Sequence, residues 1–321
     1  MRAMALGLRL TYRCNAHCQH CAYHCGPEVK GVMKLADATE YLRQASILGM
    51  SRLCISGGEP MLYPRLAAGI IKEASKRKIR SIWLFTNSYW AATRKTTESR
   101  LRKLRDTGLT RLCTSADGFH QSFIPIQRIS NAVNSAKNLG LEVVLDSRYM
   151  GIMLQLENPE NKATIQILSK LGDLVNVQDR RGPPLYVGRA AEVLTPRLID
   201  EFYLLGGYCT GPWAGGDWKK PAGIDIDSYG EVTLCPGISI GNARKLPLDT
   251  ILSSYSPRKY PIIREISSKG PEGLAEKAKA MGYKRKSNYV SACHLCYDLR
   301  KFLRNIYPEE LSPSPCYEEP A

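Results

Sequence analysis

The chain has 321 residues, which is enough for one large domain with an appendage or for two domains with a substantial apolar core. Its formal net charge of +15 is concentrated in the runs 76–80, 100–105, 284–286 and 299–304. This charge favours anionic partners, although basic runs at helical spacing are also typical of solvated helix faces. No segment approaches the roughly 18 consecutive apolar residues that cross a bilayer, so we expect a soluble protein without membrane contact.

The eleven cysteines are expected to remain reduced thiols or metal ligands. The first residues, MRAMALGLRL, show neither the apolar run nor the cleavage site of a secretory signal. We therefore expect a cytoplasmic protein, because disulfides are rare in that compartment and a chain of this length folds without them. Cys54 and Cys113 lie beside leucines in apolar runs, which predicts that they are buried core residues.

Short β-like runs alternate with amphipathic helical stretches from residue 6 to about residue 190. The expected strands are 6–12, 53–57, 81–87, 111–116, 141–149 and 173–178, and the expected helices are 37–49, 65–78, 97–107, 127–139 and 160–171. This alternation predicts parallel βα units. Six such strands fall short of the eight that close a barrel, so we expect an α/β protein with a partial (β/α)6 TIM-like barrel over residues 1–190.

Beyond residue 190 the composition changes and the βα alternation stops. Glycine, proline and tryptophan are concentrated in 204–223, and the segment 224–235 predicts a two-stranded hairpin that turns at 228–230. Short helices are expected as far as residue 305, followed by a proline-rich tail over 306–321. We therefore expect a small C-terminal α+β domain over 191–305.

Polar residues and glycines recur where the expected strands of the barrel end. Cys14, Cys18 and Cys21 follow the first strand, Gly57, Gly58, Glu59 and Pro60 the second, Thr86 and Asn87 the third, Ser115, Ala116 and Asp117 the fourth, and Ser147 and Arg148 the fifth. Each group alone could be turn chemistry. Because active sites of this architecture lie at the carboxyl ends of the strands, the recurrence predicts a functional site there.

The first cysteine cluster has the spacing C-x3-C-x2-C within CNAHCQHC, residues 14–21. A tetrahedral zinc site usually takes two CxxC-like pairs, which this spacing does not supply. Three thiolates on an iron–sulfur cube would satisfy three irons and leave the fourth open for another ligand. An open iron is a potential reaction site.

The spacing of CNAHCQHC, together with SGGEP at 56–60, resembles the radical S-adenosylmethionine (SAM) superfamily. The resemblance implies a partial barrel of six βα units and a [4Fe–4S] cluster held by Cys14, Cys18 and Cys21. SAM would bind the open iron, and one electron from an external flavodoxin-like or ferredoxin-like reductant would cleave it to methionine and a 5′-deoxyadenosyl radical.

The resemblance also implies residues that contact SAM. Gly57, Gly58 and Glu59 would receive the methionine amino group, and His20 would lie near the adenine. Further contacts, to the carboxylate and the ribose, would come from Ser115 and Arg148, with Asn87 as an additional candidate.

The remaining cysteines resemble the auxiliary-cluster appendage of radical SAM enzymes, which is called a twitch domain in its reduced form and a SPASM domain in its full form. Cys209, Cys235, Cys293 and Cys296 would then hold one further [4Fe–4S] cluster. With Cys316 this region has five cysteines, too few for two more cubes. A structural zinc site with the same four thiolates is the alternative.

Enzymes of this family with such an appendage act mostly on ribosomally made peptides or on small alcohols. The segments 115–125 and 183–192 resemble those of peptide-modifying members, including epimerases. We therefore expect hydrogen abstraction from a ribosomally synthesised peptide, an acidic one being suited to the basic surface, with epimerisation, a crosslink or a thioether as outcome. An epimerase needs a thiol as hydrogen donor, for which Cys316 and Cys25 are candidates by elimination.

Two alternatives remain open at this point. The first is a radical SAM dehydrogenase, epimerase or related enzyme that acts on a small anionic molecule such as a nucleotide or sugar. The second is a zinc-stabilised nucleic-acid-binding protein, which thiolates and basic runs together would suit. Nucleic acid is not the expected partner.

Overall fold

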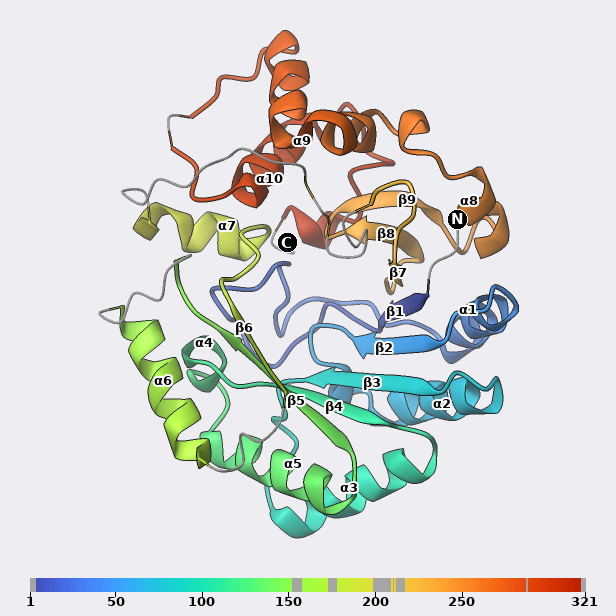
Figure 1. Ribbon diagram of the computed structural model, residues 1–321, viewed down its shortest axis with the longest axis vertical. Coiled ribbons are helices and arrows are strands. Elements are labelled where there is room, and N and C mark those ends of the chain that lie inside the picture. The colour runs from blue at the N-terminus through green and yellow to red at the C-terminus, as the bar shows by residue number, and fades with distance from the viewer. Residues whose placement is uncertain are drawn as a thin grey trace. The chain divides into compact units, whose positions relative to one another are not determined.

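A computed structural model describes residues 4–151, 158–172, 178–198, 209, 211, 217–286 and 288–318 (Figure 1). The chain divides into two compact units. One holds Gly7–Cys18 and Cys25–Pro184, and we call it the barrel unit. The other, which we call the C-terminal unit, holds Met1–Leu6, Gln19–His24 and Leu185–Ala321.

Six strands in the order β6-β5-β4-β3-β2-β1 form the sheet of the barrel unit. They are β1 (Ala5–Arg9, which the division between the units crosses), β2 (Arg52–Ser56), β3 (Ser81–Thr86), β4 (Arg111–Ser115), β5 (Glu142–Arg148) and β6 (Gln178–Gly182). From β2 to β6 each strand pairs in parallel with the next, with Ile55 opposite Leu84 and Phe85 opposite Cys113. The predicted α/β class with parallel βα units is confirmed.

Five long helices alternate with these strands and lie along one side of the curved sheet in Figure 1. They are α1 (Leu35–Ile47), α2 (Pro64–Lys76), α3 (Arg94–Asp106), α5 (Ile126–Asn138) and α6 (Pro159–Leu171), with the short η1 (Pro60–Leu62) after β2 and α4 (Gly118–Gln121) after β4. Each long helix begins slightly before its predicted start. In α3 and α6 the reason is a cap, because Thr93 and Asn158 accept backbone N–H bonds ahead of the apolar periodicity.

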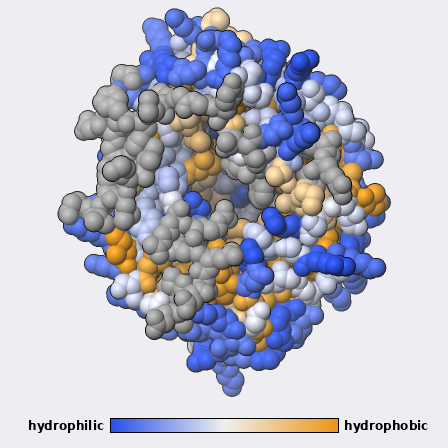
Figure 2. Space-filling view, in the orientation of Figure 1, coloured by the Kyte–Doolittle hydropathy of each residue, from blue (hydrophilic) through white to orange (hydrophobic). Residues whose placement is uncertain are grey.

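The predicted sixth strand, 173–178, lies outside the described residues except for Gln178, where the described strand β6 begins. The basic run 100–105 belongs to α3, which buries Thr97, Leu101 and Leu104 and exposes most of its arginines and lysines. Figure 2 shows hydrophilic residues along the lower edge of the visible face, where Figure 1 places α3 and α5. This basic run is therefore a solvated helix face.

The longest stretch of the C-terminal unit is Leu185–Ala321. Its first helices are α7 (Arg189–Val193) and the short η3 (Thr195–Leu198). Strands β7 (Gly223–Ile226), β8 (Glu231–Cys235) and β9 (Ile238–Asn242) are antiparallel neighbours. The rest consists of α8 (Leu248–Ser254), η4 (Pro257–Lys259), α9 (Pro261–Ala280), α10 (Ala292–Leu303) and η5 (Ser314–Cys316).

The predicted hairpin at 224–235 is confirmed as β7 and β8. Asp227 anchors its turn, because the Asp227 Oδ1 atom accepts the N–H groups of Tyr229 and Glu231, each at 2.9 Å, and Gly230 takes a φ of 89°. The third strand, β9, was not predicted. Among the described residues no helix is both long and apolar enough to cross a membrane.

Candidate functional site

The loop Gly57–Glu59 lies directly after β2. Its backbone forms hydrogen bonds with residues 11–13, the segment that leads into Cys14. The Gly58 N–H donates to the Thr11 carbonyl at 2.7 Å, and the Glu59 N–H donates to the Arg13 carbonyl at 2.9 Å. A Cβ atom at Gly58 would lie 2.2 Å from the Arg13 carbonyl oxygen, so only glycine permits this approach. The two predicted motifs are therefore joined through their backbones.

The segment that carries Cys14 is also held on its other side. The Cys14 N–H donates to the Gly26 carbonyl at 2.9 Å, and the Thr11 hydroxyl donates to the Gly31 carbonyl at 2.7 Å. Cys14, Cys18 and Cys25 are all buried. The loop of the barrel unit that contains these thiols is therefore fixed at its base by backbone pairing.

Glu59 is fully buried at the end of this loop. Its Oε1 accepts the Met61 N–H at 2.9 Å and the Thr86 hydroxyl at 2.8 Å, and its Oε2 accepts the Asn87 N–H at 2.7 Å. Burial raises the pKa of Glu59 to about 7, despite the lowering effect of these three donors. The carboxyl group therefore changes its charge near neutral pH.

Asn87 connects Glu59 with the cysteine loop. In addition to its backbone bond to Glu59, its Nδ2 donates to the Asn15 Oδ1 at 3.0 Å and makes a long contact of 3.8 Å with the Cys14 Sγ. Its Oδ1 accepts the Tyr89 N–H at 3.0 Å. The structure thus brings together Cys14, the Gly57–Glu59 loop and Asn87, which the sequence had placed only at successive strand ends.

Ser115 and Arg148 end β4 and β5, as predicted. The Arg148 guanidinium pairs with the carboxylate of Asp146 and donates to the Pro183 carbonyl at 3.5 Å. Asp146 was missed by sequence reasoning, although its i, i+2 spacing from Arg148 on a strand places both side chains on one face. A ligand that takes Arg148 would therefore compete with Asp146.

A second pair in the barrel unit was also missed. Asp117 is buried and caps α4 by accepting the His120 N–H at 2.9 Å. Both of its carboxylate oxygens also lie 2.9 and 3.0 Å from the His120 Nδ1. The spacing D-x-x-H at a helix start is the signal that could have predicted this contact.

Cys21 and His20 belong to the short stretch 19–24, which is part of the C-terminal unit. The Cys21 carbonyl accepts the Ala190 N–H at 3.0 Å, and a Cβ atom at Gly188 would lie 2.6 Å from the Ala22 carbonyl oxygen. Gly188, with a φ of 59°, is therefore required for close packing of the two segments. The segment 183–192, which the sequence singled out, holds the cysteine-bearing stretch through these contacts.

The four cysteines predicted for the C-terminal domain line one cavity of about 480 Å³ in that unit. Its other described lining residues are apolar or glycine, except for the cation Arg300. The complete described lining is Leu185, Val187, Cys209, Gly211, Trp218, Cys235, Ile238, Ile266, Pro271, Ala292, Cys293, Cys296 and Arg300. Cys316 is also buried but is not part of this lining. The structure thus brings the four predicted thiols together.

Different elements deliver these thiols. Cys235 ends β8, and Cys293 and Cys296 lie in the first turns of α10, whose cap Ser291 accepts the His294 N–H at 3.1 Å. The Trp218 indole donates to the Cys209 carbonyl at 2.7 Å. Trp218 is a site residue that sequence reasoning missed.

The thiols share one desolvated environment. Burial, together with neighbouring cysteines, raises the pKa of Cys209 to about 11 and that of Cys293 to about 12. Burial likewise raises the pKa of Cys235 well above its ordinary value. Burial therefore favours the neutral thiol form of these groups, and a bound metal cation would favour the thiolate form.

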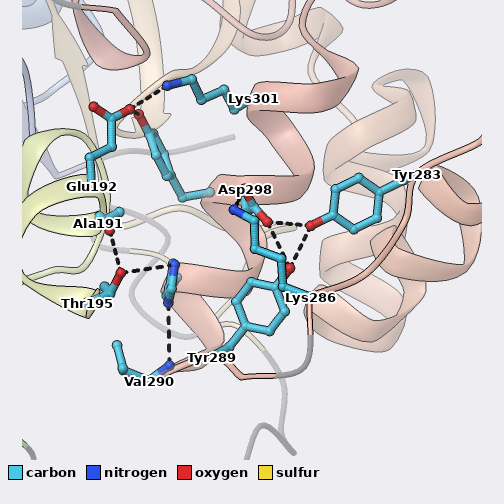
Figure 3. Close-up of polar contacts among 11 residues, drawn as sticks. Ala191, Glu192, Thr195, Tyr283, Lys286, Tyr289, Val290, Asp298 and Lys301 are labelled. Atoms are coloured by element: carbon cyan, nitrogen blue, oxygen red, sulfur yellow. Dashed lines mark hydrogen bonds and ion pairs between the residues drawn. The ribbon is translucent and has the colours of Figure 1, made fainter. Parts of the chain in front are cut away.

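A polar network contacts α10 (Figure 3). Asp298 accepts the Tyr289 hydroxyl at 2.8 Å and the Lys286 ammonium at 2.9 Å, and also the Tyr283 hydroxyl. The Tyr297 hydroxyl donates to Glu192 at 2.9 Å. These contacts fix the helix that carries the C-x2-C pair.

The same network reaches the stretch that carries Cys21. His24 is fully buried, with its Nε2 3.5 Å from the Tyr297 hydroxyl and 3.8 Å from the Glu192 carboxylate. Its N–H donates to the Pro315 carbonyl at 2.9 Å. His24 therefore anchors residues 19–24 within their unit.

Comparison with known proteins gives a family match over the first half of the chain. Residues 8–166 match the family described as the Radical SAM superfamily. The "Putative peptide biosynthesis protein YydG" of Bacillus subtilis (strain 168) is 24% identical over 209 residues, which cover 62% of this chain and 60% of YydG. The GTP 3',8-cyclase of Aquifex aeolicus (strain VF5) is 26% identical over 160 residues, 48% of this chain and 46% of the cyclase. The matches thus span less than two thirds of the length of these relatives.

Two solved structures share the fold at low sequence identity. The crystal structure of BtrN in complex with AdoMet and 2-DOIA gives a TM-score of 0.51 at 14% identity, covering 84% of this chain and 89% of BtrN. Native anSMEcpe with bound AdoMet and Cp18Cys peptide gives 0.51 at 15% identity, covering 95% of this chain and 96% of that chain.

Proposed function

Because this chain belongs to the radical SAM superfamily of enzymes, we propose that it cleaves SAM reductively and abstracts a hydrogen atom from a ribosomally synthesised peptide. The observation that carries the proposal is the backbone pairing of the Gly57–Glu59 loop with the segment that leads into Cys14. This pairing places a buried carboxylate, two glycines and a buried thiol on adjoining segments. It is the arrangement that the predicted SAM site requires.

Cys14, Cys18 and Cys21 would hold the [4Fe–4S] cluster of this site. A cluster held there would supply the one-electron chemistry that cleaves SAM to methionine and a 5′-deoxyadenosyl radical, with the electron coming from an external flavodoxin-like or ferredoxin-like reductant and the radical taking the substrate hydrogen. Asn87 supports this site through its contact with Cys14, since N–H donors to sulfur stabilise the more negative charge state of an iron–sulfur cluster. Burial of Cys14 and Cys18 limits the access of water.

Glu59 would receive the amino group of SAM. A carboxylate offers roughly four acceptor positions, and three of those on Glu59 are taken by donors among the described residues. The remaining position suits one N–H of an ammonium group. A cation there would also stabilise the ionised carboxylate, whose burial is otherwise unfavourable.

Binding of SAM should therefore weaken below neutral pH. The pKa of Glu59, about 7, lies above the ordinary 4.5, so at lower pH the carboxyl is protonated and must release a proton to pair with the ammonium. We expect the affinity, measured by calorimetry between pH 7 and 5.5, to fall about tenfold per pH unit. Glu59→Gln should bind more weakly and without this slope. A wild-type profile as flat as that of the variant would contradict the assignment.

Four observations support a second, auxiliary [4Fe–4S] cluster on Cys209, Cys235, Cys293 and Cys296. The thiols line one cavity, their environment is desolvated, two of them form a C-x2-C pair on α10 while the other two come from elsewhere in the chain, and the cavity measures about 480 Å³. A tetrahedral zinc ion holds its four sulfurs at about 2.3 Å, which would leave such a cavity largely unfilled. The cavity therefore has room for a cube.

A peptide substrate is supported by similarity alone. YydG is named for peptide biosynthesis, and anSMEcpe was solved with a bound peptide. The segment 183–192, which resembles those of peptide-modifying members, packs on the stretch of Cys21. A nucleotide is the second candidate substrate, because the GTP 3',8-cyclase relative matches 48% of this chain.

Mass spectrometry of a candidate peptide, encoded by a short reading frame beside the gene, tests the proposal. Reaction in D2O with SAM and reductant should give a gain of one mass unit for epimerisation, or a loss of two hydrogens for a crosslink or thioether. For epimerisation, Cys316→Ala and Cys25→Ala separate the two buried candidate donors. An unchanged peptide together with a converted nucleotide would overturn the peptide assignment.

A further inference from the structure

We propose that Arg300 is a positioning residue that raises the reduction potential of the auxiliary cluster, by directing a fixed positive charge and a buried N–H group at the four-cysteine cavity. This inference rests on the proposed auxiliary cluster. It goes beyond that proposal because it assigns a role to a residue that holds no iron. The inference is carried by the position, the contacts and the charge of Arg300.

Arg300 follows Cys296 by one turn of α10 and lines the cavity together with the four cysteines. Its side chain is essentially inaccessible, with 1% of its surface exposed. The Nη1 donates to the Pro236 carbonyl at 2.7 Å and to the Tyr317 hydroxyl at 3.0 Å. These bonds to the β8–β9 turn and to the segment after η5 fix the orientation of the guanidinium plane.

The Nε of Arg300 has no hydrogen-bond partner among the described residues, although it is buried. Buried polar atoms are paired in the great majority of cases, and the Arg300 side chain also interacts with the sulfur of Cys296, so its buried N–H groups lie beside the thiols of the cavity. Thiolate or sulfide sulfur is an acceptor of suitable chemistry for this donor.

The charge of Arg300 also lacks a counterpart in the cavity. Among the described lining residues it is the one cation, and no carboxylate accompanies it. A buried guanidinium without an anion is strongly unfavourable, which predicts an anionic occupant. A [4Fe–4S]2+ core with four thiolates carries a net charge of −2, and this meets the requirement.

Reduction of this group adds one electron and breaks no bond. A low-potential one-electron donor converts the core from 2+ to 1+, and the net charge changes from −2 to −3. The positive charge and the N–H donor of Arg300 both stabilise the more negative state, so they raise the potential. Zinc at the same ligands would undergo no such change.

The experiment uses the full chain with Cys14, Cys18 and Cys21 replaced by alanine, so that only the auxiliary site can hold iron. In this parent, Arg300→Gln should lower the ratio of reduced to oxidised cluster, measured by electron paramagnetic resonance at fixed applied potentials, by at least tenfold. For a one-electron couple this is a shift of about 59 mV. Arg300→Lys, which keeps the charge, should remain within threefold of the parent.

Arg304→Gln is the matched control. Arg304 lies one turn further along the chain and pairs with Glu318, and its side chain is 22% exposed. Removal of this partly exposed charge should leave the ratio within threefold of the parent, because its partner Glu318, together with water and salt, screens it.

The outcomes separate the auxiliary cluster from the role of Arg300. A parent without iron would overturn both the auxiliary cluster and this inference. A parent with iron whose ratio is unchanged by Arg300→Gln would overturn the inference alone. If Arg300→Gln cannot hold iron, Arg300→Lys is the deciding variant. A cluster in Arg300→Lys with a ratio of reduced to oxidised form close to that of the parent would support the role of the positive charge. Loss of iron from Arg300→Lys as well would overturn the inference.

Discussion

Replacement of Cys14, Cys18 and Cys21 with alanine should abolish the release of 5′-deoxyadenosine from SAM. The three thiolates are the proposed ligands of the cluster that passes the electron, so without them no electron reaches SAM. Product release, measured by chromatography under anaerobic conditions with a strong reductant, should fall to background. Iron should fall from about eight to about four atoms per chain, because the four-cysteine cavity of the C-terminal unit is untouched.

Cys54 and Cys113 provide matched controls for this loss. Both are buried in strands of the barrel unit, at 4% and 2% exposure, where they act as small core residues. Cys54→Ala and Cys113→Ala should keep the full iron content and the rate of SAM cleavage. A triple variant that still forms 5′-deoxyadenosine would show that the cluster ligands are assigned to the wrong cysteines.

Gly58→Ala should remove most SAM binding and destabilise the fold by about 1–3 kcal/mol. The added methyl group would lie 2.2 Å from the Arg13 carbonyl oxygen and 2.7 Å from that of Tyr12. Since these atoms are backbone, the Gly57–Glu59 loop must separate from the segment that leads into Cys14. Calorimetry of SAM binding and thermal unfolding of the same preparations measure the two effects.

Gly49→Ala is the control that separates the steric clash at Gly58 from the backbone strain of replacing a glycine with positive φ. Gly49 has a φ of 76°, and a Cβ atom there meets nothing within 4 Å. Its substitution should cost about 1–2 kcal/mol of stability through backbone strain and leave SAM affinity unchanged. Wild-type affinity in Gly58→Ala would contradict the role of the paired loop.

The barrel unit was predictable because its signals are local and repeated. Apolar periodicity located five helices and five strands, and the parallel order followed from their alternation. The C-terminal unit was less predictable. Strand β9 follows the turn at Pro236 and Gly237 and pairs with β8 through register shifts, and its five residues, ISIGN, alternate too briefly to predict a strand.

The predicted proline-rich tail over 306–321 contributes buried side chains to the C-terminal unit. Leu311, Cys316 and Tyr317 are buried, and the Tyr317 ring stacks on that of Tyr297 at a centroid distance of 5.8 Å. Buried aromatic and aliphatic side chains at irregular spacing hold this segment in the C-terminal unit. Such contacts depend on tertiary packing and have no periodic signature.

The candidate site also has a part that could be predicted from the sequence and a part that could not. The Gly57–Glu59 loop and Cys14 could be paired from sequence because each follows a neighbouring strand of a parallel sheet. The contact between Asn87 and Cys14 could not, since it depends on a side-chain rotamer. Arg300 was predicted only as part of the basic run 299–304, in which the Lys301 side chain is exposed and that of Arg304 is half-buried, whereas Arg300 is buried.

Metal analysis of the wild-type protein, prepared without oxygen, tests the central claim of two iron–sulfur clusters on this chain. The account predicts about eight iron and eight sulfide per chain, a brown colour and no stoichiometric zinc. A colourless protein that holds zinc, with neither iron nor sulfide, would contradict it.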